Sequence, residues 1–310
     1  MLILTEEGVY RADTPAPRPE PVRVHGGAVM VDAFTGGGVA AQADGGVAVF
    51  GLEGTDRVAS GIGDEIHCIQ VLRENPLALL IGTEPAHLYR LEDGQPAARV
   101  ESFDRLEVRA DWYTPWGGPP AVRCLARSGD DVYAAIHVGS IVRSADAGQS
   151  WAPVNPGLHP DVHQVAVCPA APERVYVNTA DAVFVSEDRG ESWRHRADGL
   201  PCRYGRAIAV HPEDPDCLLA SVSRGPRAEG TGRLFRSSDA GRSWASPDAG
   251  FPETTLDNVD TFQVAFDAGG AAWASVGDRL YRSGDRGRSW AVEWKAPAPI
   301  VAISCPPGSP

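Results

Sequence analysis

Cationic side chains stand at the first position of four short runs that read as matching β-strands. The runs are HCIQ from residue 67, RCLA from 123, HQVA from 163 and RAIA from 206. Side chains alternate along a strand, so equivalent positions of matching strands share one direction. The leading residues are His67, Arg123, His163 and Arg206. Because arginine forks bind carboxylate, phosphate or sulfate bidentately, the row predicts a binding site for an anionic ligand.

Two alternatives to an anion site stay open for this row. The arginines could pair with acids in a solvated channel and bind nothing. The acids expected on the same side are Glu6, Glu84, Asp161 and Asp260. A register slip of one residue would turn the whole row to the other side of its strands. In the remaining copies of the run we align Phe262, Val301 and Gly27 with the row.

The histidines of this region are candidates for acid–base catalysis or for metal binding. His67, His163 and His137, which ends a neighbouring run, are the candidate catalytic residues, since imidazole titrates near neutral pH. A metal ion held by His67 and His163 is the alternative use of the same side chains. No other cofactor is predicted.

Aromatic side chains concentrate in one irregular segment, residues 104–120 (DRLEVRADWYTPWGGPP). Trp112, Tyr113 and Trp116 could form a platform for a sugar ring or another flat ligand. The alternative is that the segment folds back and plugs a central channel. A second irregular segment is 223–232 (SRGPRAEGTG). Because binding residues often lie on variable loops of a rigid scaffold, we expect the ligand near these two segments.

An octapeptide, Ser-x-Asp-x-Gly-x-Ser-Trp, occurs four times. It reads SADAGQSW at 144–151, SEDRGESW at 186–193, SSDAGRSW at 237–244 and SGDRGRSW at 283–290. Calcium binding or catalysis would need the aspartates to converge, but they lie on separate repeats. We therefore predict a structural turn, in which Asp and Ser bond backbone N–H groups, Gly takes a positive φ and Trp packs between units. The residues so assigned are Asp146, Asp188, Asp239, Asp285, Trp151, Trp193, Trp244 and Trp290.

The octapeptides belong to a repeat of about 44 residues that positions all of these side chains. Three β-branched or aromatic runs precede each octapeptide and one follows it, so each unit reads as four antiparallel strands, a to d. The octapeptide is the c–d turn, and weaker copies lie upstream. Strand c is recognised in seven units by Tyr10, Phe50, Tyr89, Val142, Phe184, Phe235 and Tyr281.

The two ends of the chain complete one another. The N-terminus begins at a strand b, and residues 299–308 (PIVAISCPPG) read as a lone strand a. We predict an all-β fold: a seven-bladed β-propeller of four-stranded antiparallel blades, closed by pairing the C-terminal strand with the N-terminal blade. Residues 1–310 form a single domain, whose first blade is shared between about 1–24 and 299–308. An open solenoid of similar repeats is the alternative.

The order of strands in a blade also separates two faces. The d–a and b–c connections lie on one face, and the a–b and c–d turns lie on the other. The segments 104–120 and 223–232 are a d–a and a b–c connection, so both fall opposite the octapeptides. We expect the ligand on that face.

The octapeptide, following a Val/Leu-Phe/Tyr strand, resembles the Asp-box, or bacterial neuraminidase repeat (BNR), of sialidase-like propellers. The resemblance covers the whole chain at the level of the repeat, and it implies that the boxes lie away from the active site. It does not extend to sialidase activity, since sialidases resemble six-bladed propellers with a Phe/Tyr-Arg-Ile-Pro motif and three arginines. Here GVYRAD lacks the Ile-Pro, and the row has two arginines. Other Asp-box propellers resemble assembly factors, receptors and xyloglucan-type hydrolases, so fold alone does not assign the function.

The composition of the chain limits the classes of molecule that it is expected to bind. The net charge is −13 and there is no Lys/Arg cluster, which argues against nucleic acid and anionic membranes. No apolar run approaches the roughly 18–20 residues that span a bilayer. The N-terminus lacks the features of a secretory signal, and the six cysteines are scattered without CxxC or CxxH spacing. We expect a cytoplasmic protein with reduced, partly buried thiols, and nothing indicates an oligomeric state.

Two functions remain open. The first is a binding or assembly module for an anionic small molecule, a saccharide or a peptide. The second is a hydrolase or lyase, glycosidase-like but not a true sialidase, that acts on an anionic substrate at the channel mouth. A catalytic histidine should contact an acid and an open pocket, whereas a structural one should be packed.

Overall fold

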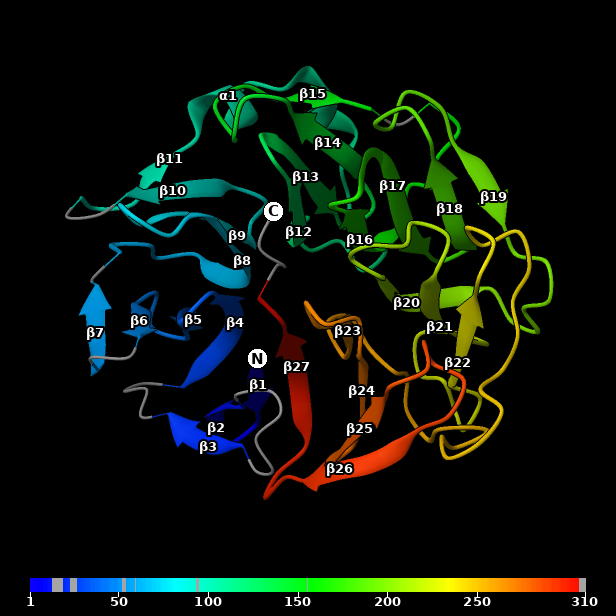
Figure 1. The fold of residues 1–310 in the computed structure, drawn as a ribbon. Coiled ribbons are helices and arrows are strands. Elements are labelled where there is room, and N and C mark those ends of the chain that lie inside the picture. Colours follow the sequence, from blue (N-terminus) through cyan, green and yellow to red (C-terminus); the bar gives the residue numbers. More distant parts are fainter. Residues whose placement is uncertain are drawn as a thin grey trace.

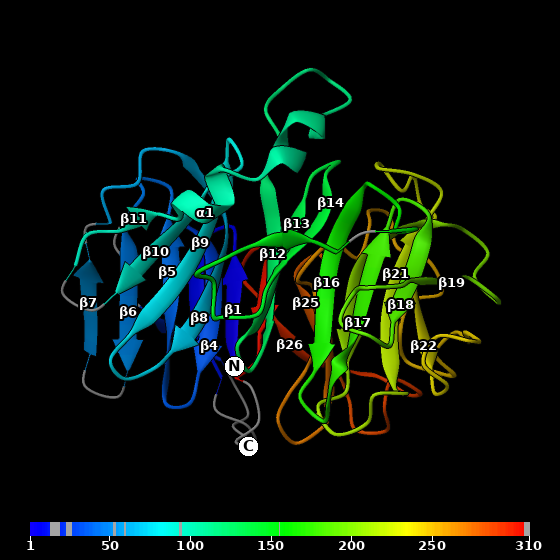
Figure 2. The same ribbon diagram turned by 90° about the horizontal axis from the view of Figure 1, so that it is seen from above.

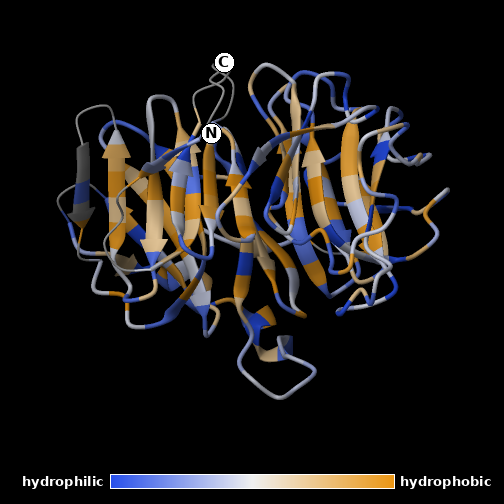
Figure 3. Ribbon diagram, turned by 90° about the horizontal axis from the view of Figure 1, so that it is seen from below, coloured by the Kyte–Doolittle hydropathy of each residue, from blue (hydrophilic) through white to orange (hydrophobic). Residues whose placement is uncertain are grey.

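Seven antiparallel sheets surround a central channel in the computed structural model, with the first strand of each sheet innermost (Figure 1). The structure describes residues 1–12, 19–22, 27–51, 54–58, 60–92, 95–154 and 156–306. These sheets confirm the predicted seven-bladed propeller. Figure 3 shows that hydrophobic residues concentrate in the strands, whereas the connections on both faces are mostly hydrophilic.

The blades are numbered in chain order, with strands given from the channel outward. Blade 1 comprises β27 (Ile300–Ser304), β1 (Leu2–Thr5), β2 (Gly8–Arg11) and β3 (Glu20–Val22). Blade 2 comprises β4 (Ala28–Phe34), β5 (Gly37–Gln42), β6 (Val47–Gly51) and β7 (Gly54–Val58). Blade 3 comprises β8 (Glu65–Arg73), β9 (Ala78–Glu84), β10 (Leu88–Glu92) and β11 (Ala98–Arg99). Blade 4 comprises β12 (Val122–Ser128), β13 (Asp131–Ile136), β14 (Ser140–Ser144) and β15 (Ala152–Pro153).

The last three blades are described in the same order. Blade 5 comprises β16 (Val162–Cys168), β17 (Ala171–Thr179), β18 (Ala182–Ser186) and β19 (Arg194–Arg196). Blade 6 comprises β20 (Tyr204–Val210), β21 (Leu218–Ser223) and β22 (Arg233–Ser237). Blade 7 comprises β23 (Val264–Phe266), β24 (Ala272–Val276), β25 (Arg279–Ser283) and β26 (Ala291–Lys295). The seven residues used to recognise strand c all lie in the third strand of their blades.

Blade 6 departs from the predicted four strands. In the described part of the chain its outer edge is reduced to one isolated bridge between Arg236 and Ala245. Pro247 follows two residues later, and proline has no N–H to donate to a ladder. The chain between Ala245 and β23 therefore runs as a long irregular connection.

The ring is closed as predicted, by pairing of β27 with β1 in antiparallel register, Leu2 opposite Ser304 and Ile3 opposite Ile303. Of the predicted first blade, residues 13–18, 23–26 and 307–308 lie outside the described residues. A partly buried carboxylate adds to the closure: Asp32 of β4 accepts hydrogen bonds from the Ser304 hydroxyl at 3.0 Å and the Val71 backbone N–H at 2.7 Å. Blades 1, 2 and 3 therefore meet at one side chain.

The core lies between the blades. Each of the seven hydrophobic clusters combines residues of two neighbouring sheets, for example Leu80 of blade 3 with Val132 and Trp151 of blade 4. The octapeptide tryptophans pack as predicted, against the preceding blade. Four of the six cysteines are buried. Cys124 is an example, and burial raises the pKa of its thiol to about 12.

The octapeptide turn has the predicted hydrogen bonds, shown by the first copy. Asp146 Oδ1 accepts the backbone N–H of Gln149 at 3.0 Å and of Ser150 at 2.8 Å, and Ser144 Oγ accepts the N–H of Gly148 at 2.8 Å. Gly148 has φ +88°, as expected, but Ala147 before it also has a positive φ, +55°. The fourth position, which is Ala or Arg, is left-handed in all four copies.

The connection between blades 3 and 4 contains two short helices that the sequence pattern did not predict. They are α1 (Glu101–Asp104) and the 3₁₀ helix η1 (Glu107–Asp111). Figure 2 shows this connection rising from the face opposite the one at which both termini lie. No helix in the part of the chain that the structure describes has the length and apolar composition needed to cross a membrane.

Candidate ligand-binding site

The predicted row of cationic residues coincides with a repeated irregularity of the innermost strands. The pairing of strand a with strand b shifts at His67, Arg123 and His163, each of which is left without a partner across the ladder. The same shift occurs at Arg206–Ala207, Val29 and Val301. A β-bulge re-aims the side chain of its extra residue. The alignment of the row is therefore correct for these blades, except that Val29 rather than Gly27 occupies the position in blade 2.

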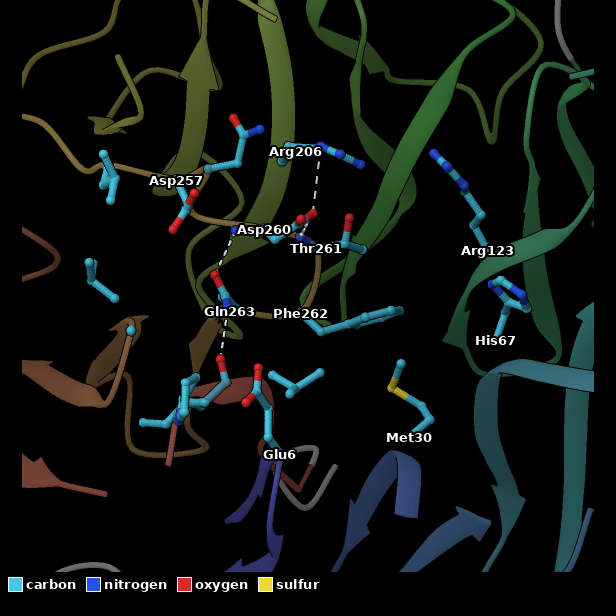
Figure 4. Close-up of a pocket in the computed structure, with 17 residues that line it drawn as sticks. Glu6, Met30, His67, Arg123, Arg206, Asp257, Asp260, Thr261, Phe262 and Gln263 are labelled. Atoms are coloured by element: carbon cyan, nitrogen blue, oxygen red, sulfur yellow. Dashed lines mark hydrogen bonds and ion pairs between the residues drawn. The ribbon is translucent and has the colours of Figure 1, made fainter. Parts of the chain in front are cut away.

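Three of the four cationic residues of the row line a cavity of about 640 Å³ at the mouth of the channel. They are His67, Arg123 and Arg206, which come from blades 3, 4 and 6 (Figure 4). The rest of the wall comes from d–a and b–c connections, including Glu6, residues 256–258, residues 260–263 and Gly277, and from strand residues such as Met30 and Val301. The cavity thus lies on the face opposite the octapeptides.

The two arginines differ in their partners. Arg206 lies over the ring of Tyr204, at 5.3 Å, and its Nε is 3.6 Å from Asp260 Oδ1 but makes no hydrogen bond. Arg123 has no hydrogen bond and no ion pair with any residue that the structure describes. Burial lowers the pKa of Arg123, and the charge of Arg206 lowers it further. The cavity wall therefore holds a partly desolvated cation without a counter-charge in contact.

His67 is the candidate histidine that faces the cavity. Its side chain is 29% exposed, and Nε2 lies 3.6 Å from Glu84 and 3.7 Å from Glu65 without a hydrogen bond.

His163 and His137 are instead packed between blades and do not line the cavity. His163 Nδ1 bonds the carbonyl of Gly205, and its ring lies 4.9 Å from Tyr204, so the side chain turns toward blade 6. Both imidazoles approach Asp161, His163 at 3.4 Å and His137 at 3.9 Å. Burial, followed by the charge of Arg123, lowers the pKa of His137 to about 4.

The structure does not bring His67 and His163 together as metal ligands. Among the described residues no group of three or more His, Cys, Asp or Glu side chains converges to hold a metal ion.

The aromatic segment 104–120 does not plug the channel, and none of its residues lines the cavity. Trp112 is buried in the core of blades 3 and 4, where it packs 5.6 Å from Phe103 and beneath the Arg109 guanidinium at 5.0 Å. Tyr113 and Trp116 are exposed, at 56% and 64%. The ring of Trp116 lies 4.6 Å from that of His137, tilted by 54°. Two rings of the predicted platform are therefore available to solvent, and the third is structural.

The channel is closed by Phe262, which forms the floor of the cavity. Its ring packs against the clusters of blades 1 and 2, 3 and 4, and 4 and 5, so it reaches across the channel. Its φ is +66°, a conformation that a bulky residue adopts only when its surroundings hold it. The side chain of Gln164 accepts its N–H at 3.2 Å, and its carbonyl accepts the N–H of Ile303 at 2.7 Å.

Sequence reasoning named Phe262 and Asp260 but did not recognise the long connection before them, which also supplies Asp257 to the cavity wall. A usable signal was present: the row residue of strand a comes 12 and 13 residues after Trp151 and Trp193, but 18 residues after Trp244. The segment 223–232 supports this connection instead of lining the cavity, since Gly230 N–H bonds the carbonyl of Leu256 at 2.8 Å.

Fold, repeated turn and axial cavity together define a seven-bladed β-propeller of Asp-box type. The Sortilin-Vps10 family model (Sortilin, neurotensin receptor 3) matches residues 139–231, fewer than a third of the chain. No curated protein matches the chain in sequence.

Solved structures with the same fold are distant in sequence. A GH74 xyloglucanase from Xanthomonas campestris is 20% identical with a TM-score of 0.63, over 87% of this chain and 46% of its own. YCF48 from Cyanidioschyzon merolae is 14% identical with a TM-score of 0.59, over 89% and 87%. YCF48 bound to D1 peptide is 15% identical with a TM-score of 0.50, over 76% and 68%. The chain thus spans less than half the length of the xyloglucanase. At these identities the likeness concerns the fold alone.

Proposed function

We propose that this propeller is a non-catalytic binding module that captures a ligand through an anionic group at the mouth of its channel. The observation that carries the proposal is Arg123, a partly buried guanidinium without a counter-charge in contact, beside Arg206 in the same cavity. Burial and a like charge both disfavour the charged form of a side chain. An anion between the two arginines would relieve both effects and accept charge-assisted hydrogen bonds.

The size of the cavity suits a small molecule or the end of a peptide. A volume of about 640 Å³ lies within the range of about 300–1,000 Å³ typical of ligand pockets. A peptide ligand gains support from the similar fold of YCF48, which has been solved with a D1 peptide bound. Tyr113 and Trp116 offer aromatic surface on the same face for a saccharide or for the rest of a longer ligand.

Calorimetric titration with carboxylate probes, glutarate and N-acetyl-triglycine, tests the proposal. Arg123→Gln and Arg206→Gln should each weaken binding at least about tenfold, as expected for loss of one charge-assisted contact. Arg288→Gln is the matched control, because Arg288 is exposed in the last octapeptide on the opposite face. Equal affinity of all three variants and the wild type would contradict the proposal.

Hydrolysis of an anionic substrate is the second candidate, and the observation that favours it is the approach of His67 to Glu84 at the cavity wall. His67 contacts an acid and an open pocket, which is the expectation for a catalytic histidine, whereas His137 and His163 are packed. Release of nitrophenolate from 4-nitrophenyl glycosides and glucuronides, lost in His67→Gln, would support this function. The wild type should release none if the propeller only binds.

A further inference from the structure

The cavity has an acidic side as well as a cationic one. Figure 4 shows His67 and Arg123 on one side of the opening, with Glu6 and Asp257 lying toward the other. The carboxylates of Glu6 and Asp257 make no hydrogen bond or ion pair with any residue that the structure describes. The cationic side of the cavity, through Arg123, and the acidic side, through Glu6 and Asp257, therefore each present a charged group that has no protein partner among the described residues.

Hydrogen bonds order the backbone of the turns that carry Glu6 and Asp257. Glu6 lies in the β1–β2 turn, where its N–H bonds the Pro299 carbonyl at 3.0 Å and Thr5 Oγ1 accepts the N–H of Gly8 at 3.1 Å. The carbonyl of Asp257 accepts the Thr255 hydroxyl at 2.6 Å. The bridge between Gly232 and Thr255 ties this segment to the 223–232 connection. These residues lie in ordered turns of the cavity wall.

A purely anionic ligand fits this cavity poorly. Glu6 and Asp257 would face it while Arg123 and Arg206 bind it, and Asp260 already lies 3.6 Å from Arg206. Like charges brought together weaken binding. A ligand that also carries a cation replaces this repulsion with attraction. Phe262, Met30 and Val301 supply apolar surface for the part of the ligand between its charges.

We infer that the ligand is zwitterionic: its anionic group binds Arg123 and Arg206, and its cationic group binds Glu6 and Asp257. The inference rests on the proposed binding function and narrows it to one chemical class, a short peptide or an amino-acid-like molecule with both charges. The acidic pair then determines specificity, because it rejects the corresponding molecule that has an anion alone.

Three peptides of the same backbone separate the two charges: triglycine carries both, N-acetyl-triglycine only the carboxylate, and triglycinamide only the ammonium. Three extended residues span about 10 Å. Titration calorimetry of the wild type should show triglycine binding at least about tenfold more tightly than either of the others. Glu6→Gln and Asp257→Asn should reduce the affinity for triglycine toward that for N-acetyl-triglycine. Both variants should bind N-acetyl-triglycine as well as the wild type does, or better.

Equal or tighter binding of N-acetyl-triglycine by the wild type would overturn the zwitterion inference. If that binding still required Arg123 and Arg206, the proposed anion site would stand. Absence of binding by all three peptides would overturn the inference, and absence of glutarate binding as well would overturn the proposed function. Because the two carboxylates have no protein partners, the thermal midpoint of each variant should match that of the wild type. Arg288→Gln is again the control.

Discussion

Arg206 faces the same cavity as Arg123 from two blades away, and its charge, after burial, lowers the pKa of the Arg123 guanidinium. Neither arginine donates to a carboxylate at hydrogen-bond distance in the described structure. Two like charges in one cavity, of which Arg123 has no acid in contact among the described residues, are costly for folding. Such strain at one position is common where a protein binds a charged ligand.

Arg123→Gln should therefore stabilise the free protein while weakening its ligand binding. The substitution removes a partly desolvated cation and its repulsion from Arg206, and gains of about 1 kcal/mol are typical of such changes. Urea unfolding in the absence of ligand measures the free energy. A loss of stability of similar size would show that Arg123 serves the fold and not a ligand.

Asp32 should make stability depend on pH in an unusual direction. Burial raises its pKa to about 6, although Val71 and Ser304 donate hydrogen bonds to it. Its folded pKa lies above its unfolded value of about 4. The contribution of Asp32 is therefore fully present below pH 4 and is lost as the pH rises through 6, by at most about 3 kcal/mol.

Asp32→Asn should remove this dependence, so the variant should gain stability relative to the wild type between pH 4.5 and 7.5. Urea unfolding at both pH values measures the difference, with the exposed Asp111→Asn as control. A constant difference across this range would contradict the raised pKa.

Removing an octapeptide aspartate should lower stability without affecting binding. Asp146 accepts two backbone N–H groups and the hydroxyls of Ser144 and Ser150. Asp146→Ala should cost about 1–2 kcal/mol, since the turn N–H groups lose their acceptor but remain near water. Calorimetric titration with triglycine should give the wild-type affinity. A loss of affinity would place function on the octapeptide face.

The lowered pKa of Asp146 predicts that the protein loses stability in acid. Burial alone would raise its pKa, but Ser150 and Ser144 together with the turn N–H groups hold it at about 2. Because this folded pKa is below the unfolded value of about 4, the contribution is present above pH 4 and is lost as the pH falls through 2. Asp146→Asn should show a shallower acid transition by circular dichroism.

Phe262→Ala should weaken both the fold and the site. The ring closes the channel and contacts three inter-blade clusters, so its removal should cost about 2–3 kcal/mol. Phe251→Ala is the matched control, because Phe251 packs on Tyr281 and Trp290 and does not line the cavity. Phe262→Ala should reduce triglycine affinity and Phe251→Ala should not. Equal effects on affinity would show that Phe262 has no separate role in the site.

The repeat made the fold predictable, and with it the positions that depend only on the repeat. Matching one unit with another predicts the octapeptide turns, the closure by β27 and the shared direction of His67, Arg123 and Arg206. His163 has the same place in its unit but is buried, because its ring meets Tyr204 and the Gly205 carbonyl of the next blade. Such contacts between blades cannot be seen in a single repeat.

Residues 246–263 could not be predicted because they interrupt the repeat. They carry no strand pattern, and the backbone of Phe262 is held by Gln164, which is 98 residues away in the chain. Of the acids that line the cavity, Glu6 and Asp260 were expected from the sequence, whereas Asp257 was not. Asp257 lies in this connection, whereas both arginines lie in the repeated strands.

A crystal structure of the protein soaked with 4-bromobenzoate tests the anion site most directly, because bromine marks the ligand by anomalous scattering and the carboxylate orientation can be read. The account predicts the ligand in the cavity above Phe262, with its carboxylate bonded to Arg123 and Arg206, and no density there in the Arg123→Gln/Arg206→Gln double variant. Ligand density elsewhere and an empty cavity in the wild type, or the same density in the double variant, would contradict it.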